Sequence, residues 1–428
     1  MFLLFLLMVC DDCKPLAERL ETAEKSIKEL ERRLLAYENA HTPPSRRYKP
    51  RLPPSEDAKR GAPEGHKGAT REDPDPTLRV ELVKETCEHC KARLPKPFWV
   101  ERKLVEEIPE PQPVEVTEYL ISHYLCSSCG EHVSADGPNL GRFGPRTCAH
   151  VALLKFSDRL PHAKVAQALA RQFNLEVTPP TVLSITNRVS DAVQHKYDAL
   201  RKQLLKEKYI HIDETSLRVA GRTYWVWVFC TNMLTFYVIQ PTRGGRVVEE
   251  LLHDYKGVVV TDGYKVYQKM GSAQQRCWAH LLREAEWLAS EHDMAKPIFD
   301  QLRTMYHEVK ALCKRAKINR QRAYDSFMLR MNQLADLCSA HREMRKFAIT
   351  LRNGINAWFT AILHKGVALT NNLAERQLRE IVVQRKIFGT LRTERGTTTL
   401  QTLMSILMTW HQKGKNALAE LTRTLTLA

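Results

Sequence analysis

Two aspartates that each follow a short β-prone run are typical of a metal-dependent active site. The run 209–213 ends in Asp213, and the run 257–262 ends in Asp262. Carboxylates at the ends of adjacent strands converge at one edge of a sheet, where they can hold divalent cations. Since buried, unpaired carboxylates are unfavourable, we expect a metal or another cation beside them. Either aspartate alone would be better explained as an ordinary strand-end cap.

The order of the elements around these aspartates predicts an α/β fold with a ribonuclease-H-like layout. Three strand-like runs precede a helical run and a fourth strand, and the aspartates end the first and fourth strands. These five runs cover 209–213, 224–229, 235–239, 246–255 and 257–262. The layout predicts that both aspartates meet near the centre of the sheet.

A third carboxylate must come from a later helix, and Glu375 is the best candidate. It lies in the helical run 370–379, which is preceded by asparagines suited to capping the helix. Basic side chains share neighbouring faces of this helix or extend past its end, which is suitable for holding DNA phosphates. These predicted DNA-binding residues are Arg376, Arg379, Arg385 and Lys386.

Two C-x-x-C pairs predict a structural zinc site. The pairs are Cys87–Cys90 and Cys126–Cys129. Each pair can present two thiolates to one ion through a tight turn, and two pairs complete a tetrahedral site. Apolar runs at 98–100 and 114–116 predict strands that connect the pairs. The alternative is that the four cysteines pack as small apolar side chains. A third pair, Cys10–Cys13, has no nearby complement and stays unassigned.

Cys277 and His280 form a C-x-x-H spacing soon after the second aspartate. As a metal half-site this pair lacks two partners, so a structural role is favoured, with His280 hydrogen-bonded near the active site. Trp278, between them, is expected in the core. Alternatively, Trp278 stacks on a flipped DNA base.

The charge balance favours a nucleic-acid partner. Lys and Arg number 65 against 49 Asp and Glu, a formal net charge of +16. Basic contacts to phosphates release condensed counterions, which strengthens binding to DNA. The apolar stretch 1–9 is too short to span a bilayer, so no membrane partner is expected. The cysteine usage favours a reducing compartment, hence a cytoplasmic, nucleoid-associated protein.

A helix–turn–helix-like region precedes the first aspartate. Apolar periodicity over 165–173, a break at 174–180 and a second periodic segment over 182–189 indicate two helices. The second helix carries groove-reading candidates, and a helix pair used only for packing is an equal alternative. These candidates are Thr181, Ser184, Asn187 and Arg188, of which Arg188 is the predicted DNA contact.

The whole chain then divides into six predicted regions. An N-terminal helix with a short heptad seam precedes a basic flexible linker, the zinc-binding module and the helical DNA-binding region. The catalytic domain follows, with a helical insertion at about 290–365, and a helical segment ends the chain. Their bounds are 1–40, 41–80, 81–140, 149–206, 207–393 and 394–428.

Four stretches of the sequence resemble the DDE transposases of the insertion sequence 66 family. They are His211–Thr215, Val260–Tyr264, Cys277–Arg283 and Thr370–Arg376. The cysteine pairs and the helical region also look like that family's zinc-binding and DNA-binding segments. The resemblance implies that Asp213, Asp262 and Glu375 are the metal-binding catalytic carboxylates, with a helical insertion between the last two.

The expected reaction is end cleavage and strand transfer of an insertion sequence with two Mg²⁺ or Mn²⁺ ions. Expected partners are terminal inverted repeats, target DNA, further copies of the chain and accessory proteins. Two alternatives stay open. One is a nuclease of the same fold that does not join strands, and the other is a zinc-containing DNA-binding protein derived from a defective transposase.

Overall fold

The computed structural model describes residues 22–24, 27, 73–136, 141–269 and 273–427. The chain divides into a small unit, 49–113, and a main unit that comprises 1–48 and 114–428. Most of the predicted N-terminal helix, including Cys10–Cys13, lies outside the described residues, although the few that are described, at 22–24 and 27, are helical. Among the described residues, no helix has both the length and the apolar character needed to cross a membrane.

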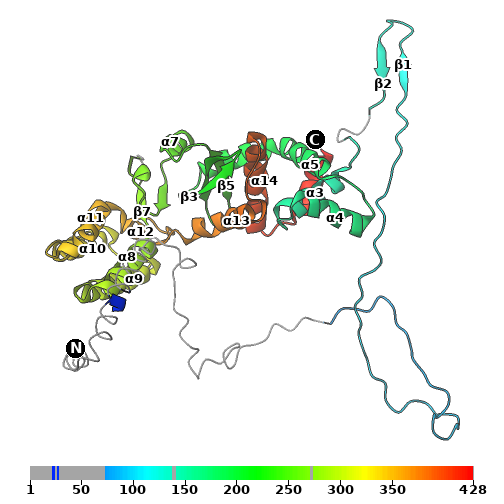
Figure 1. Cartoon of the computed structure of the whole chain (residues 1–428), viewed down its shortest axis with the longest axis horizontal. Coiled ribbons are helices and arrows are strands. Elements are labelled where there is room, and N and C mark those ends of the chain that lie inside the picture. Colours follow the sequence, from blue (N-terminus) through cyan, green and yellow to red (C-terminus); the bar gives the residue numbers. More distant parts are fainter. Residues whose placement is uncertain (1–21, 25–26, 28–72, 137–140, 270–272, 428) are drawn as a thin grey trace. The chain divides into compact units, whose positions relative to one another are not determined.

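A five-stranded sheet forms the centre of the main unit (Figure 1). Its order is β5-β4-β3-β6-β7; the first three strands are antiparallel, whereas β6 runs parallel to β3 and β7 parallel to β6. The sheet is therefore mixed, which agrees with the predicted α/β class. The strands are β3 (Tyr209–Val219), β4 (Arg222–Cys230), β5 (Thr235–Gln240), β6 (Val258–Thr261) and β7 (Gln274–Arg276).

The prediction that the first strand ends at Asp213 is wrong, because β3 continues to Val219. A tight turn with positive φ at Ala220 (46°) and Gly221 (78°) leads into β4, and such turns match the twist of a hairpin. Asp213 nevertheless lies close to the point where the pairing of β3 with β6 ends. The parallel pairing with β6 stops at His211, so Asp213 lies beyond the β3 residues that pair with β6, while it still pairs with Val228 of β4. The short polar strand β7 was not predicted at all.

The edge strand β5 is covered by helix α14 (Glu394–Gln412). One helix face carries Gln401, Ser405 and Thr409, four residues apart, and their side-chain oxygens accept the backbone N–H groups of alternate β5 residues at 2.9–3.0 Å. An edge strand otherwise exposes unpaired backbone groups, so this helix closes the sheet on that side.

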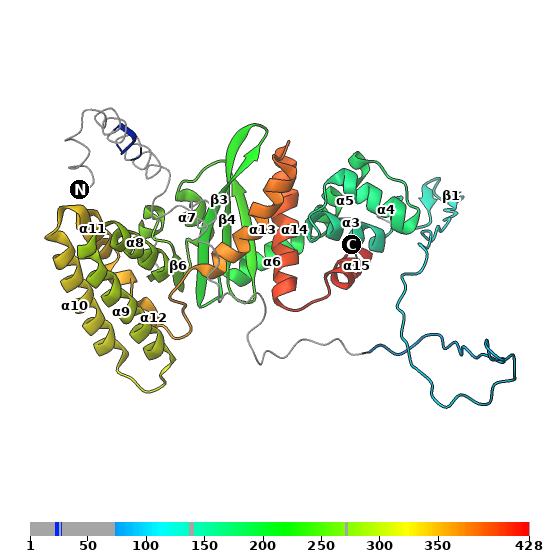
Figure 2. The ribbon, with the colours of Figure 1, turned by 60° about the horizontal axis from the view of Figure 1, so that its bottom comes forward.

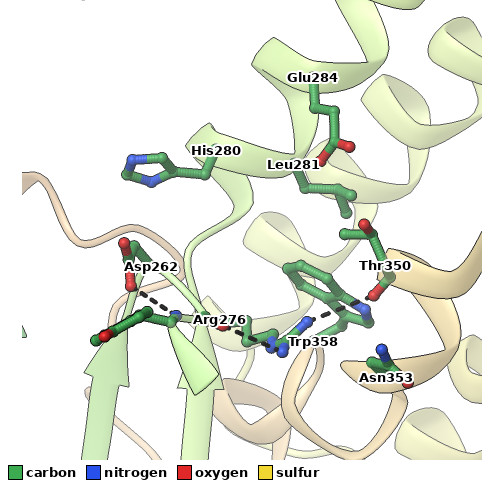
Figure 3. Close-up of a pocket in the computed structure, with 10 residues that line it drawn as sticks. Asp262, Arg276, His280, Leu281, Glu284, Thr350, Asn353 and Trp358 are labelled. Atoms are coloured by element: carbon green, nitrogen blue, oxygen red, sulfur yellow. Dashed lines mark hydrogen bonds between the residues drawn. The ribbon is translucent and has the colours of Figure 1, made fainter. Parts of the chain in front are cut away.

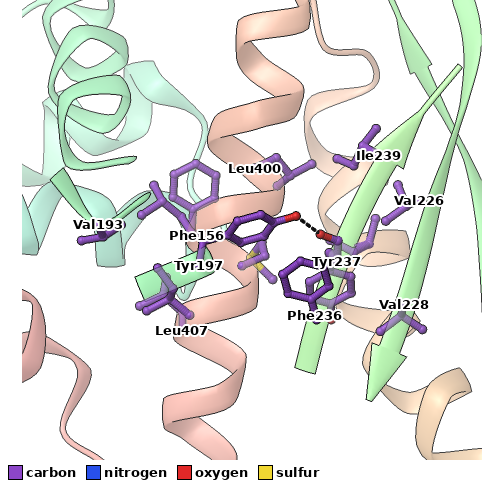
Figure 4. Close-up of a cluster of buried hydrophobic side chains, with 14 of the residues drawn as sticks. Phe156, Val193, Tyr197, Val226, Val228, Phe236, Tyr237, Ile239, Leu400 and Leu407 are labelled. Atoms are coloured by element: carbon purple, nitrogen blue, oxygen red, sulfur yellow. Dashed lines mark hydrogen bonds between the residues drawn. The ribbon is translucent and has the colours of Figure 1, made fainter. Parts of the chain in front are cut away.

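A large apolar core lies between the sheet, α14 and the preceding helices (Figure 4). Phe236 and Tyr237 of β5 share this core with Leu400 and Leu407 of α14, and the Tyr197 hydroxyl donates to the Tyr237 carbonyl at 2.8 Å. Helix α13 (Asn372–Phe388) packs on β3 and β4. These contacts fix the strands that carry the candidate site.

The helices predicted before the sheet are present. They are α3 (Pro145–Phe156), α4 (His162–Phe173), α5 (Pro179–Ala192) and α6 (Gln194–Leu204). Asn174 ends α4 in the left-handed region, and the Thr178 side chain caps α5 by accepting the N–H of Thr181. Helix α5 packs against α3, α4 and α14, while α15 (Ala417–Thr426) packs on α3.

The segment after β7 forms a helical layer with its own apolar core. Figure 2 shows this layer at the β6–β7 side of the sheet, away from α14, and α12 contacts β7. Its helices are α8 (Trp278–Glu291), α9 (Lys296–Lys314), α10 (Arg320–Ser339), α11 (Arg345–Asn353) and α12 (Thr360–Leu363). Single 3₁₀ turns occur in this region and before it, at 265–269, 293–295, 342–344 and 355–357. Helix α7 (Arg246–Leu252) connects β5 to β6.

The strands predicted at 98–100 and 114–116 are absent. Both runs lack regular structure, and Phe98 and Trp99 are largely exposed, since neither run has a partner strand to bury an apolar face. The strands of this part of the chain are instead β1 (His123–Leu125) and β2 (His132–Ser134), an antiparallel pair around Cys126–Cys129.

Candidate active site

The structure brings the three predicted carboxylates together. Asp213 lies within β3, Asp262 directly after β6, and Glu375 in the first turn of α13. The backbone holds two of them: Asp213 Oδ1 accepts the N–H of Glu214 at 2.9 Å, and Asp262 Oδ1 accepts the N–H of Tyr264 at 2.8 Å. Three separate elements therefore converge on one acidic cluster.

Burial and like charges make this cluster a candidate site for a cation. Burial raises the pKa of Asp213 well above its ordinary value, and the charges of Asp262, Glu214 and Glu375 raise it further. Among the described residues, the buried Oε1 atom of Glu375 has no hydrogen-bond partner. Carboxylate oxygens are the ligands that Mg²⁺ and Mn²⁺ prefer, so the donor set fits such ions.

Asn371, just before α13, positions Glu375 against the sheet. It was expected to cap the helix, but its side chain makes no capping hydrogen bond. Instead, the fully buried side chain donates from Nδ2 to the Ile212 carbonyl at 2.8 Å and lies 3.1 Å from His211 Nδ1. Its backbone N–H donates to Cys277 Sγ at 3.1 Å. One asparagine thus ties α13 to β3 and to the start of α8.

Cys277, His280 and Glu375 form a second cluster, with one potential ligand atom of each within 4.8 Å of the others. His280 Nε2 lies 3.7 Å from Glu375 Oε1. Glu375 therefore supplies one of the two partners that the C-x-x-H spacing lacked. Burial raises the pKa of the Cys277 thiol to about 11, and a bound cation would favour the thiolate that ligates metal. These three side chains therefore form a possible metal site that shares Glu375 with the acidic cluster.

Trp278 belongs to the core, as the structural interpretation predicted. Its side chain is fully buried, and its indole N–H donates to the Trp358 carbonyl at 2.7 Å. The alternative interpretation, in which Trp278 stacks on a flipped base, is wrong because no face of the ring is accessible.

A second acidic site, which the sequence did not reveal, lies on the same strand at Glu214. Arg243 donates two hydrogen bonds to Glu214 Oε1, at 2.7 and 2.9 Å, and the Tyr267 hydroxyl donates to Oε2 at 2.5 Å. The Arg243 guanidinium also lies over the rings of Trp225 and Tyr264. Consecutive strand residues point to opposite faces, so Glu214 has its own hydrogen-bond partners, although its charge still raises the pKa of Asp213.

The predicted DNA contacts on α13 fall into two groups. Arg376, Arg379 and Lys386 are exposed. Arg385 is half-buried and donates to Thr215 Oγ1 at 3.0 Å and to the Ser216 carbonyl. Arg385 therefore also ties α13 to β3, while its contact with DNA stays a prediction.

The groove-reading prediction for α5 needs correction at Asn187. Its side-chain oxygen accepts the Thr399 hydroxyl at 2.7 Å, and its carbonyl accepts Arg395 of α14. Arg188 is half-buried, with one guanidinium nitrogen beside Gly141, and its DNA contact is untested. Of the four predicted groove-reading residues on α5, Ser184 alone is exposed. The α5 surface available to a DNA groove is therefore smaller than predicted.

Both cysteine pairs adopt the same local fold. The carbonyls of Cys87 and Cys126 accept the N–H groups of Lys91 and Gly130, which have positive φ (61° and 74°). Backbone N–H groups of Cys90 and His89 lower the pKa of Cys87, and those of Cys129 and Ser128 lower that of Cys126. Each turn suits two thiolate ligands. The pairs lie in different units, and their joint zinc site stays a prediction.

The sequence is similar to two proteins of Sinorhizobium fredii, both of them uncharacterized. The chain is 22% identical to y4qI over 323 residues, which cover 66% of this chain and 59% of y4qI. It is 21% identical to y4hP over 391 residues, which cover 78% of this chain and 70% of y4hP. The match thus spans less than two thirds of the length of y4qI.

The family described as Transposase IS66 family matches residues 140–399, a range that includes all five strands of the sheet and all three carboxylates. Since this match covers more than half of the chain, the protein belongs to the Transposase IS66 family.

Proposed function

We propose that this chain is a DDE-type transposase that cuts the ends of an insertion sequence and joins them to target DNA. The observation that carries the proposal is the cluster of Asp213, Asp262 and Glu375, in which burial and like charges raise the pKa of Asp213. Such a cluster is unfavourable by itself and fits an oxygen-liganded cation.

The sheet supports a ribonuclease-H-like core for this proposal. Three antiparallel strands are followed by a helix and by parallel strands on the other side of β3, in the order β5-β4-β3-β6-β7. This order places Asp213 and Asp262 on neighbouring strands at the sheet centre. The helical layer α8–α12 is then an insertion between Asp262 and Glu375.

Asp213, Asp262 and Glu375 would hold two Mg²⁺ or Mn²⁺ ions. When bound, such ions activate water and stabilise the attacking and leaving oxygens of an in-line displacement. Asn371 would keep Glu375 in place through its bonds to β3. The exposed guanidiniums of Arg376 and Arg379, beside Glu375 on α13, would contact the phosphates of the DNA strand. No serine or tyrosine nucleophile is required, since water and then the freed 3′-OH attack the phosphorus.

The proposed partners are terminal inverted repeats and target DNA. Phosphate contacts by the basic residues would fix register, and α4–α5 would supply base contacts. The cysteine pairs would bind one structural Zn²⁺. Joining two ends requires at least two copies of the chain, accessory proteins are expected, and the place of action is the cytoplasm.

The test is an assay of end cleavage and strand transfer on the DNA that flanks the element, with Mg²⁺. Wild type is compared with Asp213→Asn, Asp262→Asn and Glu375→Gln. The proposal expects joined products from wild type alone. Cleaved but unjoined ends would indicate a nuclease, and tight DNA binding without cutting by any protein would indicate a defective transposase.

A further inference from the structure

The starts of helices α8 and α13 lie together at the acidic cluster. Cys277 directly precedes α8, His280 lies in the first turn of that helix, and Glu375 lies in the first turn of α13. The backbone fixes the two helix starts to each other, since the Trp278 N–H donates to the Leu369 carbonyl at 2.9 Å. One potential ligand atom from each of the three side chains lies within 4.8 Å of the other two.

Backbone donors surround the sulfur of Cys277, which is fully buried. The Asn371 N–H donates to Sγ at 3.1 Å. Burial raises the pKa of this thiol, and the backbone N–H groups of Asn371, His280 and Ala279 oppose that rise. N–H groups at the start of a helix stabilise a thiolate, which is the form that binds metal. A cysteine that only filled space in the core would need no such donors.

The imidazole of His280 and the carboxylate of Glu375 complete a set of three ligands. Among the described residues, the buried Oε1 atom of Glu375 has no hydrogen-bond partner, and His280 Nε2 lies 3.7 Å from it. Two ligands of one tetrahedral ion lie roughly 3.5 Å apart, so this separation already fits. The side chains of His280 and Glu375 are 24% and 37% exposed, so small rotations can bring them closer to the sulfur.

The donor set and its surroundings favour Zn²⁺. This ion binds thiolate, imidazole and carboxylate ligands in tetrahedral sites, whereas Mg²⁺ binds oxygen ligands. A thiolate and a carboxylate together balance the two charges of the ion. Figure 3 shows His280 projecting from α8 beside a pocket of ≈ 350 Å³ that Asp262 also lines. This pocket can supply a water as the fourth ligand, which distinguishes the site from a closed structural zinc site.

We propose that Cys277, His280 and Glu375 bind one Zn²⁺, and that this ion competes with the cations of the acidic cluster for Glu375. The zinc site itself stands without the proposed function, whereas the competition rests on it. Two divalent cations that share one carboxylate repel each other, so each lowers the affinity for the other by the same factor. Mg²⁺-dependent cleavage would therefore be inhibited by Zn²⁺ bound at this site.

The first experiment titrates Co²⁺ into the full chain, because Co²⁺ takes the ligands of Zn²⁺ and its bond to a thiolate gives a charge-transfer absorption band. One equivalent of Zn²⁺ is added beforehand, which we expect the four paired cysteines to bind. The band should be lost in Cys277→Ser, and Co²⁺ affinity should fall at least about tenfold in His280→Gln, a change at the rim that leaves the core intact. Cys313→Ser, a half-buried thiol outside the cluster, is the matched control. Absence of the band in wild type, or its persistence in Cys277→Ser, would overturn the zinc site.

The second experiment measures the competition by calorimetric titration of Mn²⁺, with and without one further equivalent of Zn²⁺. Zn²⁺ should weaken Mn²⁺ binding at least about tenfold in wild type and leave it unchanged in Cys277→Ser. Unchanged Mn²⁺ affinity in wild type, or equal weakening in both proteins, would contradict the sharing of Glu375. Absence of Mn²⁺ binding by wild type would instead contradict the proposed function, and the Co²⁺ band would still decide the zinc site.

Discussion

Asp213 and Glu214 are neighbours on one strand, yet they have opposite surroundings. Burial raises the pKa of Asp213 well above its ordinary value, and the charges of Asp262, Glu214 and Glu375 raise it further. Glu214 is 2% exposed and meets the Arg243 guanidinium and the Tyr267 hydroxyl, which together bond both of its oxygens. The carboxylates around Asp213 repel one another, whereas Glu214 is paired with Arg243 and Tyr267, although burial still raises its pKa.

The difference distinguishes the proposed metal site from a structural ion pair. A buried carboxylate is stable in a fold when donors or an opposite charge surround it, as they do at Glu214. The repulsion around Asp213 destabilises the metal-free protein, and a divalent cation would relieve it. An acidic residue is therefore a functional candidate here because of what surrounds it, not because it is buried.

The largest expected effect is on DNA cleavage. Asp213→Asn should lower the rate of end cleavage at least about a thousandfold, since it removes a ligand of the cation that stabilises the reacting oxygens. Glu214→Gln should lower it less than about tenfold. Both rates come from the same assay with Mg²⁺. Equal losses of cleavage rate in the two variants would show that the Asp213 cluster and the Glu214 ion pair do not differ in function.

The next effect is on the free energy of unfolding. Arg243→Ala leaves the Glu214 carboxylate buried without its cation, which should destabilise the protein by about 2 kcal/mol after allowance for the partly exposed arginine. The double variant Arg243→Ala with Glu214→Gln should recover most of that loss. Denaturant unfolding measures all three proteins. A double variant no more stable than Arg243→Ala would show that the ion pair is not the cause.

At the cluster of Asp213, Asp262 and Glu375, a substitution is expected to raise the free energy of unfolding. In chelator-treated protein, Asp213→Asn replaces one of three like charges by a neutral amide, so it should stabilise the fold by on the order of 1 kcal/mol. Thermal unfolding with chelator and then with Mn²⁺ checks this. Wild type should gain stability from Mn²⁺ and the variant should not. A destabilised variant under chelator would contradict the repulsion described above.

The last effect concerns pH, and it comes from a residue outside both carboxylate clusters. Burial and the Lys155 charge lower the pKa of His162 to about 4. The unfolded chain therefore binds more protons between pH 4 and about 6.5, so stability rises with pH across this window and is complete above it. His162→Gln should flatten that rise in unfolding curves measured at several pH values. An unchanged slope would assign the pH dependence to other groups, among them the two carboxylate clusters.

The acidic cluster could be predicted from the sequence because its members follow strong local patterns. Apolar runs end near Asp213 and Asp262, and a periodic helix carries Glu375, so their convergence follows from strand order. The extension of β3 was missed because the segment Glu214–Ser216 is polar. That its side chains alternate between the two faces of the sheet is apparent only from the pairing with β4. The strand β7, with the sequence Gln-Gln-Arg, has no apolar signal, and tertiary pairing alone makes it a strand.

The Glu214 site and the role of Asn371 could not be predicted for a similar reason. Glu214 and Arg243 are 29 residues apart, and Asn371 and His211 are 160 apart, so nothing local links them. The hydroxyl-bearing face of α14 was likewise invisible, because a helix with Ser405 and Thr409 on one side looks solvent-exposed until the β5 edge is placed against it.

The most direct test of the account is calorimetric titration of Mn²⁺ into the metal-free wild type, Asp213→Asn and Glu214→Gln proteins. Mn²⁺ prefers oxygen ligands, so the cysteine pairs contribute little to its binding. The account predicts that Glu214→Gln binds Mn²⁺ like wild type and that Asp213→Asn loses most of the binding. Retained binding in Asp213→Asn, together with its loss in Glu214→Gln, would contradict the assignment of the metal site.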